Sequence, residues 1–134
     1  MNDFVIGKAE RIHVDSRRMM FADIFPPSVI ETNAVLINPH ASAGDFHRHA
    51  RQSDFWVVLA GILSVGLKND EIHATILMDT FRHAGDVLEI PPGWWHTYKA
   101  GPAGAVLVYG LTNKYDGTDE DRLPYDVGEV ALYG

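Results

Sequence analysis

The stretch HRHARQSDFWVVLAG, residues 47–61, sets two histidines one residue apart ahead of an acid and an apolar run. Side chains alternate between the two faces of a β-strand, so His47 and His49 share one face. The small and polar residues 50–53 favour a turn, after which a new strand begins. The pattern predicts two neighbouring imidazoles, with Asp54 just beyond the turn.

A third histidine follows a proline and glycine corner in GDVLEIPPGWWHTYK, residues 85–99. A tight turn at residues 91–93 would send the next strand back across the sheet. Trp94, His96 and Tyr98 would then share one face of that strand. We therefore expect three histidines and the carboxylate of residue 54 to converge.

The rest of the chain has the pattern of an all-β protein. Its apolar stretches are short, rich in valine and isoleucine, and separated by turn residues, which is typical of an antiparallel barrel or sandwich. Residues 17–28 are interpreted as one short helical turn, and residues 68–71 as a hairpin tip. The acidic tail from Asn113 keeps enough apolar residues to pack on the body. Strands are predicted at residues 32–38, 55–60, 62–67, 73–78, 86–90 and 105–110, with Gly61 as the break between the second and third.

Length and charge narrow the function classes. A chain of 134 residues fits one domain, residues 1–134. The net charge of -7 argues against nucleic-acid binding, because phosphate contacts need clustered lysine and arginine. Charged residues interrupt the start of the chain, and no apolar run is long enough to span a bilayer, so we expect no membrane partner and a cytoplasmic protein.

The two histidine stretches together resemble the signature motifs of the cupin superfamily. The first motif matches His47, His49, Asp54 and Gly61, and the second matches Gly85, Pro91, Gly93 and His96. This resemblance implies a double-stranded β-helix, or jelly-roll barrel, in a single cupin domain. It also implies pairing through edge strands, so we expect a homodimer.

The chain has no cysteine, so any metal ligands must be nitrogen and oxygen atoms. His47, His49, Asp54 and His96 are the expected ligands of one divalent metal ion. Fe, Mn, Ni, Zn and Cu all suit three imidazoles and a carboxylate, and affinity order does not choose among them. Asp54 could bind the metal directly, bind it through water, or only hydrogen-bond a histidine.

Within the cupins, the segment from Ile90 onward resembles the dTDP-4-dehydrorhamnose 3,5-epimerases and their relatives. The matching downstream run consists of Tyr109, Thr112, Tyr115, Asp119 and Glu120. By this resemblance His47 removes a proton next to a ketone, and Tyr115 returns one from the opposite side. Neutral imidazole is a base suited to that step near neutral pH.

Several aromatic residues are candidates for a substrate pocket, because pockets in β-barrels are mostly apolar with a few polar groups. Trp56, Trp94, Tyr98 and Tyr109 could line such a pocket, and simple core packing explains them equally well.

The leading hypothesis is a metal-binding enzyme that acts on a small oxygen-rich substrate, a carbohydrate or keto acid, by isomerisation, epimerisation or a related lyase step. A metal-dependent dioxygenase and a non-catalytic ligand-binding cupin are the alternatives.

Overall fold

The computed structural model describes residues 2–124 of the chain. Ten strands and one three-residue 3-10 helix make up the regular structure of this part, which confirms the all-β prediction. None of the helical segments within it has the length and hydrophobicity needed to span a bilayer. The strands of the main sheet are β1 (Val5–Lys8), β4 (Glu31–Ile37), β5 (Asp45–His49), β6 (Asp54–Lys68), β7 (His73–Asp79), β8 (Asp86–Ile90), β9 (Trp95–Leu111) and β10 (Glu120–Pro124).

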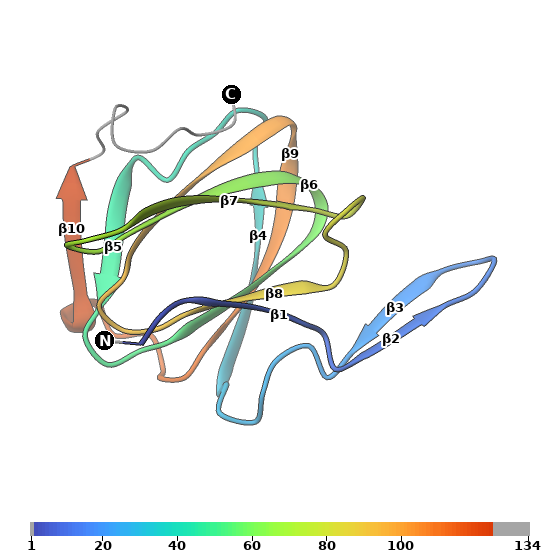
Figure 1. Ribbon diagram of the computed structural model, residues 1–134, viewed down its shortest axis with the longest axis horizontal. Coiled ribbons are helices and arrows are strands. Elements are labelled where there is room, and N and C mark those ends of the chain that lie inside the picture. Colours follow the sequence, from blue (N-terminus) through green and yellow to red (C-terminus); the bar gives the residue numbers. More distant parts are fainter. Residues whose placement is uncertain (1, 125–134) are drawn as a thin grey trace.

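The two longest strands, β6 and β9, form the centre of the sheet. The order of hydrogen-bonded neighbours is β1-β8-β6-β9-β5-β10, with β7 also on β6 and β4 also on β9. Both long strands bend, so the sheet curls around a common interior (Figure 1). This curled antiparallel sheet is the jelly-roll architecture that the sequence motifs predicted.

Gly61 lies inside β6, and the expectation that it ends a strand is wrong. Two irregularities in the β6–β9 register flank this glycine, so the predicted strands 55–60 and 62–67 form one continuous, bulged strand. Its φ of +76° is in the left-handed region that glycine adopts without strain. A Cβ atom there would overlap the carbonyl oxygen of Gly104 and lie 2.9 Å from the Cα atom of Ala105. The glycine therefore allows two backbones to approach closely at the bend.

Residues 17–28 contain no helix, which corrects the predicted helical turn. Strands β2 (Arg11–Val14) and β3 (Met19–Ala22) form a separate hairpin that projects from the body (Figure 1). The Asp15 carboxylate accepts hydrogen bonds from the backbone N–H groups of Arg17 and Arg18. This side chain closes a tight turn, so the chain reverses direction there instead of coiling.

Two other local predictions are confirmed. Strand β6 ends at Lys68 and β7 begins at His73, so the predicted tip is the turn of a hairpin. Asn69 accepts backbone hydrogen bonds from Glu71 and Ile72 in that turn. The tail packs on the body through β10, which pairs with β5. Its apolar residues Tyr125, Val127, Val130, Leu132 and Tyr133 lie outside the described residues.

The core fills the space between the two halves of the curled sheet. Its fully buried members come mainly from β6, β8 and β9, where alternate side chains point inward. The largest are Trp94, Phe46, Leu63, Leu67, Leu88 and Ile90.

Replacing Gly61 by alanine should destabilise the fold by more than about 3 kcal/mol, because the new methyl group adds a backbone clash to the strained positive φ. Gly44 is a matched control, since its φ is +87° but a Cβ atom there meets nothing within 4 Å. Gly44→Ala should cost only about 1 kcal/mol. Urea denaturation of both variants measures the difference, and equal losses would contradict the close approach at Gly61.

Candidate functional site

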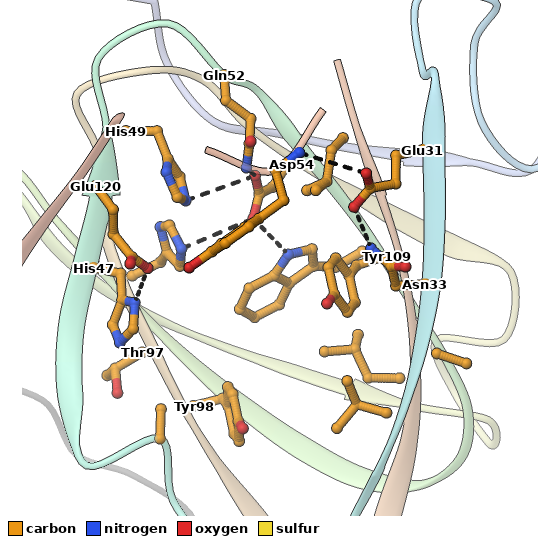
Figure 2. Close-up of a pocket in the computed structure, with 18 residues that line it drawn as sticks. Glu31, Asn33, His47, His49, Gln52, Asp54, Thr97, Tyr98, Tyr109 and Glu120 are labelled. Atoms are coloured by element: carbon orange, nitrogen blue, oxygen red, sulfur yellow. Dashed lines mark hydrogen bonds and ion pairs between the residues drawn. The ribbon is translucent and has the colours of Figure 1, made fainter. Parts of the chain in front are cut away.

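The interior of the sheet contains a cavity of about 510 Å³ that is open to solvent on one side. Side chains from β4, β5, β6 and β9 surround it, together with residues of the segment that leads into β10 (Figure 2). The polar lining residues are Glu31, Asn33, His47, His49, Gln52, Asp54, His96, Thr97, Tyr98, Tyr109, Tyr115 and Glu120.

The structure brings the three predicted histidines together. His47 on β5 is the register partner of His96 on β9, so the two strands carry their imidazoles side by side. The ring centroid of His96 lies 6.3 Å from that of His47 and 5.5 Å from that of His49. The two motifs, almost fifty residues apart in sequence, therefore meet at one wall of the cavity.

Backbone carbonyl groups fix the orientation of two of these rings. His49 donates from Nδ1 to the carbonyl oxygen of Asp119 at 3.1 Å. His96 donates from Nδ1 to the carbonyl oxygen of Trp94 at 3.3 Å. With Nδ1 acting as the donor, Nε2 of each neutral ring keeps a free lone pair. Burial lowers the pKa of His96, and the nearby Asp54 carboxylate opposes this only in part, so this ring is neutral at neutral pH.

Asp54 lies opposite the two free nitrogens. Its oxygens are 4.0 Å from Nε2 of His49 and 3.9 Å from Nε2 of His96. Gln52 donates to one carboxylate oxygen at 2.6 Å, and the indole of Trp56 donates to the other at 3.3 Å. These bonds hold the buried carboxylate, and each of its oxygens retains a lone pair directed to other partners.

His49, Asp54 and His96 form a donor set that fits a metal ion. Their ligand atoms all lie within 4.8 Å of one another. Two imidazole nitrogens and one carboxylate, with no sulfur, suit the first-row divalent ions. The carbonyl groups behind the rings and the donors behind the carboxylate supply the outer hydrogen bonds that orient metal ligands.

His47 lies outside this group of three, although the sequence analysis placed it among the ligands. Its Nδ1 donates to Glu120 at 2.6 Å, and its Nε2 contacts Asp45. Arg122 also approaches Nε2, at 3.3 Å. Both ring nitrogens therefore face charged side chains on β5 and β10, whereas the other two histidines face Asp54.

The sequence analysis gave no role to Asp119 and Glu120, although it noted both in the acidic run of the tail. The Asp119 carboxylate accepts hydrogen bonds from the backbone N–H groups of Ala50, Arg51 and Gln52. It thus closes the turn between β5 and β6 that positions the histidines. Glu120 is the hydrogen-bond partner of His47. Pairing between β5 and β10 brings Asp119 and Glu120 next to these partners. The two strands are about seventy residues apart in the chain, and the local sequence does not indicate which distant strands will pair.

The hydrogen bond to His47 determines the charge of Glu120. Burial by itself would raise the pKa of Glu120. The hydrogen bond from His47, together with the positive charge of Arg122, outweighs burial and holds this pKa below its usual value. Glu120 is therefore a carboxylate at neutral pH, as a partner that orients an imidazole must be.

Three of the four predicted pocket aromatics line the cavity: Trp56, Tyr98 and Tyr109. Trp94 does not line it. This residue precedes the start of β9, and its ring is buried edge-on against Phe4, with its indole N–H bonded to the Asn2 carbonyl. Burial raises the pKa of both cavity tyrosines, so they are neutral hydrogen-bonding groups at neutral pH. Tyr115 lies at the exposed rim, 65% accessible.

Comparison with solved structures agrees with this architecture. The QdtA 3,4-ketoisomerase of Thermoanaerobacterium thermosaccharolyticum, in complex with TDP, is 18% identical with a TM-score of 0.76, over 88% of this chain and 86% of that one. The WlaRB TDP-quinovose 3,4-ketoisomerase of Campylobacter jejuni is 17% identical with a TM-score of 0.77, and the match covers 92% of this chain and 95% of that one. The rmlC epimerase of Mycobacterium tuberculosis is 15% identical with a TM-score of 0.75, and the match covers 90% of this chain and 68% of that one.

These structures belong to the cupin superfamily. The present chain has the cupin fold. No protein-family model matches this sequence, and no curated protein sequence matches it. At such low identity the likeness shows a shared architecture, so function must be argued from the residues in the cavity.

Replacing Glu120 by glutamine should destabilise this cupin by about 1–2 kcal/mol at neutral pH, because a charged hydrogen bond to His47 is lost. The pKa of Glu120 is lower in the folded protein than in the unfolded chain, where it is near 4.5. The ionised side chain therefore stabilises the fold at pH values above 4.5. This stabilisation is lost as the pH falls from 4.5 through the lower pKa of the folded protein. Unfolding free energies from pH 3 to 7 should therefore converge for parent and variant at acid pH. The control variant Glu71→Gln, on an exposed turn, should have the same unfolding free energy as the parent at every pH. If Glu120→Gln lowered the unfolding free energy by the same amount at all pH values, the role of the Glu120 charge would be contradicted.

Proposed function

We propose that this cupin is an enzyme of the isomerase or epimerase type, which transfers a proton next to a carbonyl group in a small oxygen-rich substrate. One observation carries the proposal: the cavity contains an imidazole hydrogen-bonded to a carboxylate, His47 with Glu120, beside the imidazoles of His49 and His96. Proton abstraction beside a carbonyl needs a base of that kind within reach of a bound substrate. The ketoisomerases and the epimerase with the same fold support this class of reaction by analogy.

His47 is the proposed proton-transfer residue. Its side chain is 23% exposed, compared with 11% for His49 and 8% for His96, so it is the most accessible of the three rings. Glu120 accepts a hydrogen bond from the Nδ1–H group and stabilises the positive charge that the ring acquires when Nε2 takes a proton. Asp45, in contact with Nε2, is placed to accept that proton onward. Tyr115 at the rim is the proposed donor that returns a proton to the substrate.

We also propose that His49, Asp54 and His96 hold one divalent metal ion, with His47 left for proton transfer. Their convergent lone pairs and the hydrogen bonds behind them support this division. When bound, such an ion would act as a Lewis acid that polarises the substrate carbonyl group. Its identity is open among Fe, Mn, Ni, Zn and Cu.

The same donor set favours a second candidate function. Two histidines and one carboxylate with open positions are the ligands of many non-haem iron enzymes that use oxygen. A metal-dependent dioxygenase is therefore the alternative enzyme class. The reactions differ in stoichiometry, because proton transfer consumes no oxygen.

Metal titration of the purified, chelator-treated protein tests the metal proposal. Calorimetry with Zn²⁺, Mn²⁺ and Fe²⁺ should show one site per chain. His49→Ala, Asp54→Ala and His96→Ala should weaken binding by about 100-fold or more, because each removes a ligand. His47→Ala should stay within about threefold of the parent, since that ring lies outside the group. Equal losses in His47→Ala and His96→Ala, or no binding by the parent, would rule out this site.

Solvent hydrogen exchange tests the reaction. Incubation with keto sugars in D₂O, followed by NMR, should show deuterium entering the carbon next to the carbonyl group. His47→Asn should reduce the rate by about 100-fold or more, the usual contribution of a positioned acid or base. His13→Asn, on the projecting hairpin, should exchange at the parent rate. Parent rates in His47→Asn would remove its assigned role, and oxygen consumption coupled to turnover would favour the dioxygenase.

A further inference from the structure

The wall of the cavity is acidic. Glu31, Asp54 and Glu120 all line it, and no lysine or arginine lines it among residues 2–124. Residues 125–134 contain no lysine or arginine in the sequence. A hydrogen bond from Asn33, aided by the Tyr115 N–H and the charge of Lys114, lowers the pKa of Glu31 against the effect of burial. Both glutamates are thus ionised at neutral pH, and the three carboxylates exceed the charge of a single divalent ion.

Two arginines near the cavity are each paired with two carboxylates of the protein. Arg122 donates to Asp45 at 3.3 Å and to Glu120 at 3.1 Å. Arg51 pairs with Asp116 at 3.2 Å and with Asp119 at 3.4 Å. Both guanidinium groups are therefore already engaged by carboxylates, with which a bound anion would have to compete.

Backbone groups near the cavity are occupied as well. Successive N–H groups in a turn form a concave site that can bind an anion. The turn at residues 50–52 has this form, but the Asp119 carboxylate already fills it. The helix among the described residues spans only Gly117–Asp119. Arg51, Arg122 and the N–H groups of this turn are therefore already engaged by carboxylates of the protein.

The cavity does offer groups that suit a neutral hydroxylated ligand. Carboxylates accept hydrogen bonds from hydroxyl groups, and the tyrosines can both donate and accept. Trp56, Tyr98 and Tyr109 add apolar ring surface for the carbon skeleton.

We infer that the substrate of this cupin is an uncharged polyhydroxy carbonyl compound, such as a free monosaccharide, and not a sugar linked to a nucleoside diphosphate. The inference rests on the proposed function and specifies its substrate class. QdtA, which has the same fold, binds TDP. In the present chain, the cavity of this fold is lined by the carboxylates of Glu31, Asp54 and Glu120, which would repel a diphosphate.

Binding measurements with both ligand classes test the inference. The probes are TDP and TDP-glucose on one side, and free glucose, xylose, fucose and fructose on the other. Saturation-transfer NMR and calorimetry on the full chain should show at least one free sugar bound, with TDP at least tenfold weaker than the best sugar. TDP binding as tight as the best sugar, or no binding of any free sugar, would overturn the inference.

Two variants locate the cause. Glu31→Gln should strengthen TDP binding about fivefold, because one negative charge leaves the cavity wall. Glu71→Gln makes the same charge change on an exposed turn and should alter the binding of neither ligand. Equal effects of the two glutamate variants on TDP would contradict a role for the cavity charge.

The exchange assay separates this inference from the proposed function. Deuterium incorporation into TDP-4-keto-6-deoxyglucose, but into none of the free sugars, would leave the proton-transfer proposal intact and would overturn the substrate class. Incorporation into free fructose but not into the TDP-sugar is the expected result.

Discussion

The antiparallel pairing of β6 with β9 is the constraint on which the rest of the structure depends. These strands pair from Asp54 with Leu111 to Lys68 with Trp95, and both bend where the backbone at Gly61 approaches Gly104. The bend allows the two halves of the sheet to face each other, so that apolar side chains fill one part of the interior and a cavity remains in the other. Without that bend the sheet would stay open, and the cavity residues would lie on a flat surface.

A second feature is the use of carboxylates inside the fold. Asp54 accepts from Gln52 and Trp56, and Asp119 accepts from three backbone N–H groups of one turn. A buried carboxylate is tolerated only when such donors replace water. Each of these acids also contacts a histidine, through the side chain of Asp54 or the carbonyl of Asp119. The donors that compensate the burial of these acids therefore belong to the same network that orients the imidazoles.

The three histidines differ in environment despite their proximity. His49 and His96 each donate to a backbone carbonyl and face Asp54, whereas His47 lies between Glu120 and Asp45. Backbone carbonyl groups fix a tautomer without adding charge, and this suits a ligand of a cation. Carboxylates stabilise an imidazolium, and this suits a residue that gains and loses protons. His47 and His49 lie on β5 and His96 lies on β9, so the two environments adjoin in a cavity of a size that fits a small molecule.

The sequence by itself predicted the all-β class, the cupin architecture, and the three histidines and Asp54 that line the cavity. It did not predict the continuous strand through Gly61 or the hairpin of β2 and β3. Alternation and spacing are local properties, so His47, His49 and the turn before Asp54 could be recognised directly. Tertiary structure decided which partner each side chain meets, because strand pairing joins segments that are distant along the chain. The pairing of β5 with β10 brought Glu120 to His47, which lies outside the group formed by His49, Asp54 and His96. Trp94 had the parity of a pocket residue, but it precedes β9 and is buried against Phe4, a contact that strand periodicity does not encode.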